Sequence, residues 1–339
     1  MTQLDLDPQN VRRLVIFRLG SIGDTVVALP CFKFLATRFE NAERVLLTNR
    51  PRQGEAPVAS VLDGTGLIDR AIPYDAGERG PLKLFSLFRQ LRAERADLLV
   101  YLSEAGSTAR AARDLFFFRL AGLPVAVGAP TTDDLVHARV DQSTGLVEHE
   151  ADRLARCLLP LGEVDTSDPA GRSLDLRDDE CAEAAALLEP ISAASGFLAV
   201  AASAKVAAKD WGAANWMDLI GRLGETHGDL ALVMIGGAGE HARAQAVLAV
   251  WPGPVLDLSG RANPRVSAAV MARARLFLGT DGGPMHLAAS TGTRCLALFS
   301  GYNEPGRWYP MGPGHQILRK NVMTEIEPSR VASAVRAML

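Results

Sequence analysis

Short apolar runs alternate with amphipathic segments along the whole chain. The runs are typical of buried strands, and the segments between them carry apolar residues at helical spacing. In the first half the pattern predicts strands at 12–19, 43–49, 97–103 and 124–129 and helices at 25–39, 81–95, 110–123 and 148–162. Pro30 is expected to lie in the second turn of the first helix and to kink it. Strands separated by helices imply a parallel sheet.

A second series of the same kind follows a polar stretch at 163–180, which is rich in acids, contains Pro and Gly, and is the best linker candidate. The series predicts strands at 197–203, 229–237, 254–260, 275–280 and 293–300 and helices at 215–228, 239–250, 264–274 and 286–292. The tail at 327–339 has Pro at a helix start and predicts a last amphipathic helix. Two series joined by a linker predict an α/β protein of two Rossmann-like domains facing a cleft. A length of 339 residues agrees with that number.

Composition narrows the class of protein. A net charge of -3 gives no global attraction to nucleic acid or anionic lipid. The four cysteines are scattered without a CxxC pair, which argues against a disulfide framework or a zinc site and fits a reduced cytosol. The polar start of the chain does not resemble a signal peptide, and no apolar run approaches the ~20 residues of a membrane span. We expect a cytoplasmic protein that at most touches a membrane surface.

The first candidate motif is FRLGSIGDTVVALP, residues 17–30, which predicts a strand, a glycine turn and a helix. Its spacing is not the dinucleotide fingerprint G-x-G-x-x-G. Gly20 and Gly23, on either side of Ser21, still let the backbone approach a ligand at the carboxyl end of a strand. Asp24 falls at or next to the helix N-terminus, where it is either a helix cap or a functional carboxylate.

The second candidate is the loop ASAKVAAKDW, residues 202–211, which follows the first strand of the second half. Ser203, Lys205 and Lys209 lie in it. A loop lysine is either a solvated charge or, as a compact cation, a group that neutralises phosphate.

The third candidate is the glycine turn MIGGAGEH, residues 234–241. Glu240 follows the glycines at a helix start. Its carboxylate either complements the helix dipole or binds ribose hydroxyls.

The fourth candidate is GTDGGPMHLAAS, residues 279–290, where an acid, bare backbone and an imidazole separate a strand from a helix. Asp281, Gly282 and Gly283 are expected to form a turn whose N–H groups face an anion. Pro284 suits the first turn of the helix, whose N-terminus favours a phosphate. His286 lies in the same turn, where it is either structural or a donor to a phosphate oxygen.

The segment 79–119 is basic and aromatic. Eight Lys and Arg residues, including Arg79, Arg110 and Arg113, stand against four acids, so its charge is 8 − 4 = +4. Five phenylalanines lie in it as well. Two interpretations stay open: ordinary amphipathic helices, or a surface for an anionic glycolipid or the inner membrane leaflet.

Together these motifs resemble glycosyltransferase family 9, the lipopolysaccharide heptosyltransferases, over nearly the whole chain. RLGSIGDTVVALP is similar to the family's R-L-x-x-x-G-D-x-x-x-x-x-P signature, and GTDGGPMHLAASTG to its D-x-G-x-x-H-x-A-A-x-x-G block. AKDW and GGAGEH match its donor-side loops. The resemblance implies the GT-B fold, with an N-terminal acceptor domain at 1–170, a nucleotide-sugar domain at 171–320 and a C-terminal helix within 321–339 that packs back on the first domain.

The resemblance also implies a reaction, an inverting transfer of heptose from ADP-heptose to a lipopolysaccharide core acceptor. Asp24 would be the general base on the acceptor hydroxyl, in a loop with Gly20, Ser21 and Gly23. Lys209 would neutralise the departing diphosphate. A lysine and a helix N-terminus serve that purpose without metal, and no D-x-D pair stands out, so we expect metal independence and no cofactor.

The donor is expected to lie in the second domain. By the resemblance Ser203 would hydrogen-bond the diphosphate, Glu240 would bind the ribose, Asp281 would orient the sugar, and the turn 282–286 would hold phosphate. Many members carry Thr or Ser where Gly282 stands. The alternatives are a transferase with another nucleotide sugar or acceptor, a sugar-nucleotide epimerase of the same fold, or a non-catalytic nucleotide-sugar binder.

Overall fold

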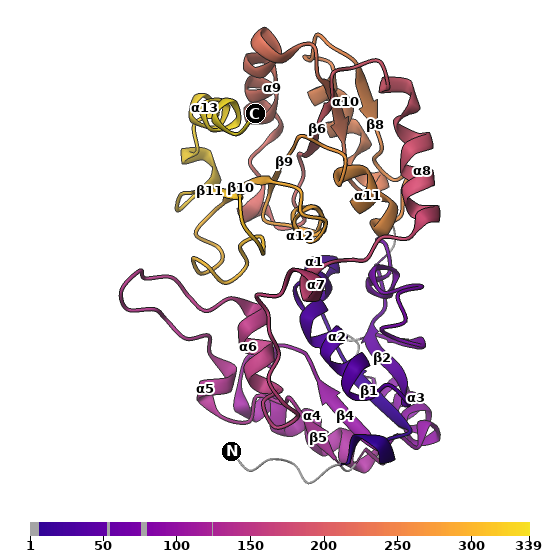
Figure 1. The fold of residues 1–339 in the computed structure, drawn as a ribbon. Coiled ribbons are helices and arrows are strands. Elements are labelled where there is room, and N and C mark those ends of the chain that lie inside the picture. The colour runs from indigo at the N-terminus through magenta and orange to yellow at the C-terminus, as the bar shows by residue number, and fades with distance from the viewer. Residues whose placement is uncertain (1–6, 53–54, 76–79, 124) are drawn as a thin grey trace. The chain divides into compact units, whose positions relative to one another are not determined.

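The computed structural model describes residues 7–52, 55–75, 80–123 and 125–339 (Figure 1). They divide into two compact units. The first holds the described residues up to Arg52 together with Pro57–Arg172, and the second holds Glu55–Ala56 together with Ser173–Leu339. The division after Arg172 lies close to the boundary expected after residue 170.

The first unit is built on a five-stranded parallel sheet with the order β3-β2-β1-β4-β5. Its strands are β1 (Arg13–Phe17), β2 (Glu43–Asn49), β3 (Arg70–Tyr74), β4 (Leu98–Tyr101) and β5 (Ala126–Val127). Its helices are α1 (Ile22–Val27), α2 (Leu29–Arg38), α3 (Pro81–Glu94), α4 (Thr108–Leu120), α5 (Asp133–Val136), α6 (Glu150–Cys157) and α7 (Pro169–Arg172). The pattern predicted four of these five strands and missed β3, which includes a proline. Pro124, placed in the predicted strand 124–129, lies outside the described residues.

Helices α3 and α4 cover the same face of this sheet. Val15 and Phe17 of β1 point to that face, because alternate residues of a strand share a side. They belong to one hydrophobic cluster with Leu87 and Leu91 of α3 and Phe118 of α4. The outer sides of the two helices therefore belong to one surface of the first unit.

The helix predicted at 25–39 is two helices. The first, α1, starts earlier than expected, and the chain breaks at Ala28 (φ −85°, ψ 0°) before α2 begins. Pro30 lies in the first turn of α2, where its missing N–H costs no hydrogen bond. It thus helps to start a second helix instead of kinking one long helix.

The second unit is built on a six-stranded parallel sheet with the order β11-β10-β9-β6-β7-β8. Its strands are β6 (Phe197–Ala201), β7 (Ala231–Met234), β8 (Val255–Asp257), β9 (Leu276–Thr280), β10 (Cys295–Phe299) and β11 (Gln316–Arg319). Its helices are α8 (Asp178–Leu188), α9 (Ala213–His227), α10 (His241–Leu248), α11 (Pro264–Met271), α12 (Gly283–Ser290) and α13 (Pro328–Met338). The pattern predicted five of these six strands; β11 follows a loop rich in Gly and Pro and was missed.

The C-terminal helix α13 has its buried face in the core of the second unit, and its expected packing on the first domain stays a prediction. Val331 and Val335 join the same hydrophobic cluster as Trp216 and Leu219 of α9. Trp211, just before α9, donates from its Nε1 to the carbonyl of Ile326 at 3.0 Å and ties the tail to this unit.

The stretch expected as a linker, 163–180, also contains structure. Helix α7 lies in it, and α8 begins in it. Glu180 of α8 is nearly buried and receives two hydrogen bonds from Arg265 of α11, at 2.6 Å and 3.0 Å. Acid-rich composition here marks a helix start, where acids complement the dipole, as well as a domain boundary.

Each sheet has a point where the order of its strands reverses. In the first unit the chain runs outward from β1 through β2 to β3 and then returns to β4 on the other side, so the reversal lies between β1 and β4. In the second unit it lies between β6 and β9. Parallel α/β sheets bind ligands outside the carboxyl ends of the strands at such points. The loops after β1, β6 and β9 carry three of the four candidate motifs.

Candidate active site

The turn after β1 is built around a glycine. Gly20 has φ 143°, a region that favours glycine, and a Cβ there would lie 2.7 Å from the Cβ of Asp24. Its N–H donates to Asn49 Oδ1 at 2.9 Å. The sequence suggested that Gly20 leaves room for a ligand. The structure gives a further reason, because Gly20 leaves room for Asp24 itself. Gly23 lies buried in α1.

Asp24 caps its own helix from inside the first turn. Ser21 is the N-cap residue, and its backbone N–H and its hydroxyl both donate to Asp24 Oδ2, each at 2.6 Å. Asp24 is therefore the third helical residue, the reciprocal position of a capping box, and not the N-cap that one interpretation allowed. Its side chain is 28 % exposed, so it is both locally held and open to solvent.

A buried arginine lies beside Asp24, and the sequence analysis did not single it out. Arg18 is 1 % exposed. Its guanidinium donates to the carbonyl of Asp24 and, at 2.6 Å, to the carbonyl of Leu102 after β4, and it stands 3.8 Å from Asp24 Oδ1. It joins the loops on both sides of the strand reversal. The available signal was the first position of the R-L-x-x-x-G-D signature, an arginine that directly follows an apolar strand.

In the second unit the loop after β6 presents Lys209 from a short 3-10 turn, Ala207–Lys209. The loop is held at its end by Trp211, which is 1 % exposed, and by Asp210, whose carboxylate pairs with Arg243 at 2.6 Å. Ser203 is half-buried at the start of the loop. Lys205 is exposed and pairs with Glu55 at 2.9 Å. Because Lys209 lies next to this fixed end of the loop, its cation has a defined position.

Lys209 and Asp281 meet across the strand reversal. Lys209 Nζ lies 2.8 Å from Asp281 Oδ2, and the two side chains are only 16 % and 7 % exposed. Asn303, which the sequence analysis missed, donates from Nδ2 to the same carboxylate oxygen at 2.5 Å. The ring of Tyr302 lies 5.2 Å from Lys209 Nζ, within reach of a cation–π contact. Asn303 lies in the long loop after β10, where no spacing signal marks it.

The helix that follows Asp281 offers few backbone donors. Pro284 has no N–H, and the N–H groups of Met285 and His286 donate to the carbonyl of Gly282 at 3.2 Å and 3.5 Å. Among the described residues, the N–H groups of Gly282 and Gly283 have no partner. These two donors lie at the N-terminus of an eight-residue helix, next to Asp281, where a helix favours an anion.

His286 is nearly buried, at 4 % exposed, and its ring meets the ring of Trp308 edge-on with centroids 6.4 Å apart. Its expected hydrogen bond to phosphate stays a prediction. Gly282 has an extended backbone (φ −169°), and a Cβ there would be 3.8 Å from its nearest neighbour, the Thr280 carbonyl oxygen. The position therefore has room for a serine side chain.

Glu240 lies in the turn after β7 and folds back over it. Its Oε2 accepts from the N–H of Gly237 at 3.2 Å, and a Cβ on Gly236 would lie 2.3 Å from that oxygen. Burial raises the pKa of this carboxyl, while the Gly237 N–H and the positive charges of Lys205 and Arg243 act in the opposite direction. Among the described residues its hydrogen bond goes to Gly237 and not to Lys209 or Asp281, and its binding of ribose stays a prediction.

Within the described part of the chain, no group of three or more His, Cys, Asp or Glu side chains is placed to hold a metal ion. Over the same residues, no helix has both the length and the apolar character that a bilayer crossing requires.

Two parallel-sheet units with polar loops gathered at their strand reversals define the GT-B class of α/β enzymes. The model of glycosyltransferase family 9 (heptosyltransferase) matches residues 84–334. The chain belongs to this family and is a glycosyltransferase. No curated protein matches its sequence.

Solved structures agree on the fold. The glycosyl transferase family 9 protein from Veillonella parvula has a TM-score of 0.75 at 19 % identity and covers 98 % of each chain. E. coli heptosyltransferase WaaC with ADP-2-deoxy-2-fluoro heptose has a TM-score of 0.66 at 17 % identity, covering 96 % of this chain and 100 % of that one. UDP-GlcNAc 2-epimerase from Neisseria meningitidis has 0.54 at 10 %, covering 96 % and 90 %. At these identities the likeness concerns the fold, which transferases and an epimerase share.

Proposed function

We propose that this protein transfers heptose from ADP-heptose to an inner-core lipopolysaccharide acceptor, with inversion and without a metal ion. Family membership supports the class of reaction. The observation that carries the donor side is the contact between Lys209 and Asp281 at the strand reversal of the second unit. A half-buried cation, a carboxylate and two unpartnered N–H groups within one site are the groups that a sugar diphosphate requires.

On the donor side, each group takes one part of the nucleotide sugar. The N–H groups of Gly282 and Gly283, the ammonium of Lys209 and the hydroxyl of Ser203 donate hydrogen bonds to the negative diphosphate. Glu240 accepts from the ribose hydroxyls, and Asp281 accepts from hydroxyls of the sugar. His286 completes the phosphate turn.

Binding of the donor requires a change at the Lys209–Asp281 pair. In the structure the two charges neutralise each other. A diphosphate that takes Lys209 leaves Asp281 held by Asn303 and free to accept from the sugar. The positive charge then stabilises the leaving group as its negative charge develops, which is where electrostatic help lowers a barrier.

On the acceptor side, Asp24 takes the proton of the attacking hydroxyl. The acceptor oxygen bonds to the anomeric carbon, the bond from that carbon to the diphosphate oxygen breaks, and ADP leaves with the electron pair. Gly20 and Ser21 place the carboxylate, and Arg18 is a buried cation beside it. General base catalysis of this kind contributes about 10²–10⁴ in rate.

The proposal includes a location and partners. ADP-sugars and a growing lipopolysaccharide core meet at the cytoplasmic face of the inner membrane, so we place the protein in the cytoplasm with peripheral contact to that face. The partners are a nucleotide sugar and an anionic glycolipid, not nucleic acid.

The test is a transfer assay with ADP-heptose and lipopolysaccharide from a strain that lacks core heptose. We expect ADP release that depends on the acceptor, and a product whose anomeric configuration is opposite to that of the donor by NMR. A converted sugar nucleotide without acceptor would favour an epimerase. Turnover with UDP- or GDP-sugars alone would support a glycosyltransferase but contradict ADP-heptose as its donor.

A further inference from the structure

The outer sides of α3 and α4 carry an unusual share of exposed apolar side chains. Leu82 and Phe85 of α3 are 84 % and 59 % exposed, and Phe116 and Leu120 of α4 are 65 % and 54 % exposed. Leu84 adds a fifth, so these two helices hold five of the thirteen large exposed apolar residues among those described. Single exposed apolar residues are ordinary, but a concentration on one face marks an interaction surface.

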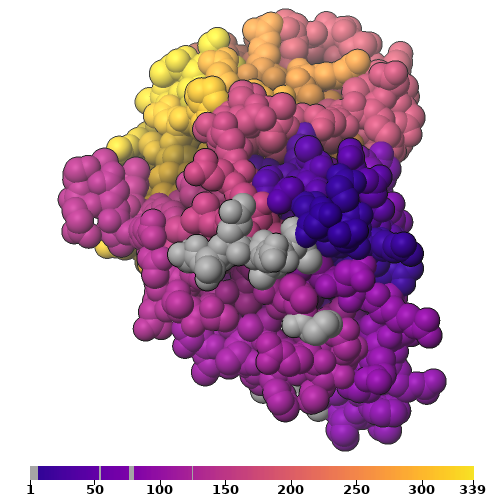
Figure 2. Space-filling view, turned by 60° about the horizontal axis from the view of Figure 1, so that its bottom comes forward, coloured from indigo at the N-terminus to yellow at the C-terminus, as the bar shows by residue number. Residues whose placement is uncertain are grey.

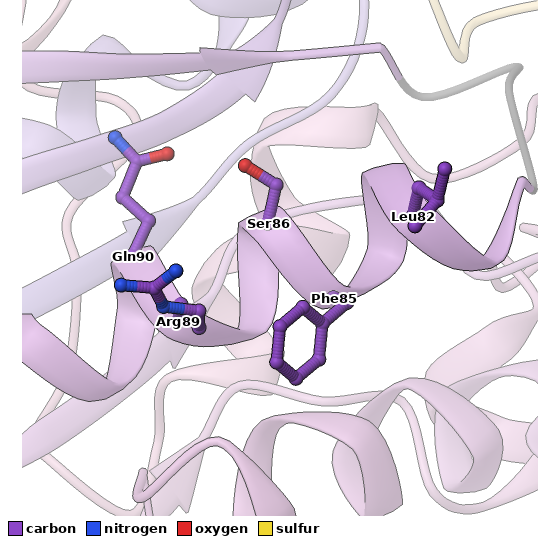
Figure 3. Close-up of a pocket in the computed structure, with 5 residues that line it drawn as sticks. All are labelled: Leu82, Phe85, Ser86, Arg89 and Gln90. Atoms are coloured by element: carbon purple, nitrogen blue, oxygen red, sulfur yellow. The ribbon is translucent and has the colours of Figure 1, made fainter.

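The two helices present these residues together. They cover the same face of the sheet through one shared cluster, and a Cβ on Gly122, just after α4, would touch the Arg92 side chain of α3 at 4.0 Å. Figure 3 shows Leu82, Ser86 and Gln90 along one line of α3 and Phe85 beside them on another side of the helix. These side chains line a shallow hollow of about 320 Å³. In Figure 2 the purple to magenta part of the chain that includes both helices spreads over the lower part of the view.

The charges on this face are positive and largely unpaired. Among the described residues, five arginines of this face have no carboxylate partner. Four lie in the two helices and the fifth directly follows α3: Arg89, Arg92, Arg110, Arg119 and Arg95. Arg113 pairs with Asp114, Lys83 pairs with Asp75, and Arg79 lies outside the described residues. Glu94 is buried and pairs with Arg13 and Arg70 instead of facing this surface.

We propose that this α3–α4 face docks the protein on an anionic bilayer surface. Unpaired arginines attract phosphate headgroups, and exposed Phe and Leu side chains enter the boundary between headgroups and acyl chains. The face combines both kinds of side chain, and its positive charge complements an anionic leaflet although the whole chain carries -3. The inference deepens the proposed function, on which its biological meaning rests, because the acceptor of that function is a lipid. Its test requires neither nucleotide nor acceptor.

The test is co-sedimentation of the full chain with vesicles of phosphatidylcholine, alone or mixed with phosphatidylglycerol. We expect binding only to the anionic vesicles, and weaker binding as salt rises, since exposed charges are screened. The pair Arg89→Glu and Arg119→Glu should weaken binding at least about tenfold, because each basic residue near such a surface contributes about fivefold. The pair Phe85→Ser and Phe116→Ser should weaken vesicle binding at low salt and at high salt alike.

Matched controls lie in the second unit. Arg273→Glu with Arg330→Glu makes the same change in net charge at exposed arginines, and Val250→Ser with Val255→Ser removes exposed apolar side chains. Binding should survive both, and circular dichroism confirms that all variants fold. The proposal is overturned if the control pairs lose as much binding as the matching α3–α4 pairs. It is also overturned if the α3–α4 variants bind as well as the wild type, or if the wild type does not bind anionic vesicles. Calorimetry with ADP on the same preparations distinguishes this proposal from the proposed function. Vesicle binding without ADP binding would support the docking face and contradict the transferase. ADP binding without vesicle binding would contradict the docking face alone.

Discussion

The two units place an aspartate in the same kind of position and use it differently. Asp24 follows the central strand β1, and Asp281 follows β9, each at the point where the strand order reverses. Asp24 lies inside the first turn of its helix and is held by Ser21. Asp281 lies ahead of its helix and contacts two residues from other loops, Lys209 and Asn303.

The difference shows which aspartate needs a function to explain it. A capping box alone accounts for the position of Asp24, because satisfying the free N–H groups of a helix stabilises it. Asp281 caps nothing, and its burial with a lysine has a desolvation cost that packing with apolar side chains would avoid. Geometry therefore supports the donor site, whereas chemistry and family resemblance support the role of Asp24 as base.

The largest expected effect concerns Asp24. Asp24→Asn keeps an oxygen that accepts from the Ser21 N–H but removes the proton acceptor, so kcat should fall about 10²–10⁴-fold. The affinity for ADP, measured by calorimetry, should stay the same. Unchanged kcat would reduce Asp24 to a helix cap. Ser21→Ala serves as the matched control, because it removes one of the contacts of the cap and leaves the carboxylate.

Lys209 gives the next effect. Lys209→Ala removes a charged contact to the diphosphate, which is worth about 1.5–3 kcal/mol, so the Kd for ADP should rise about ten- to hundredfold. Lys205→Ala is the control, because this lysine lies four positions away, is exposed and pairs with Glu55. Equal effects of the two variants would mean that general charge, and not the position of Lys209, attracts the nucleotide.

A change at Asp281 should weaken the binding of the sugar and not the binding of the nucleotide. Asp281→Asn keeps the size of the side chain but weakens its bonds to sugar hydroxyls, and it removes the competitor for Lys209. We expect ADP-heptose to bind about tenfold more weakly while ADP binds as well or better. A parallel loss for both ligands in calorimetry would place Asp281 in a structural role.

Glu240 should make nucleotide affinity depend on pH. Burial raises the pKa of its carboxyl above the ordinary 4.5, so lowering the pH through that raised value protonates it and removes the acceptor for the ribose hydroxyls. The Kd for ADP should rise a few-fold on the acid side. Glu240→Gln should bind more weakly at neutral pH and lose this part of the pH dependence, while the titration of the phosphate near pH 6 remains. Identical pH profiles for the two proteins would exclude Glu240 from the ribose site.

The smallest expected effect is at Gly282. Gly282→Ser fits the extended backbone and the open space there, and its hydroxyl adds a donor beside the phosphate turn. Affinity for ADP-heptose should change by no more than about fivefold, toward tighter binding. A large loss would show that the site depends on bare backbone at this position.

The sequence predicted what local patterns control and missed what distant segments create. Parallel strands and the turns after β1 and β9 follow from apolar runs and from glycines, so the two units and their reversal points were predictable. The contacts of Arg18 with Leu102 and of Asn303 with Asp281 were not, because only folding brings these distant residues together. The core that α13 joins was not predictable for a related reason. An amphipathic pattern predicts a helix with an apolar face, but the core that receives this face depends on Trp216 and its neighbours.

The central claim is that the loops after β6, β7 and β9 form a binding site for an ADP-sugar. The most direct test is calorimetric titration of the full chain with ADP, UDP, GDP and NAD at one salt concentration, in the wild type and in Lys209→Ala. The account predicts a clear preference for ADP, and a much weaker signal for ADP in the variant. A preference for UDP or GDP would contradict the ADP-sugar donor, and the absence of binding to any nucleotide would contradict the site itself.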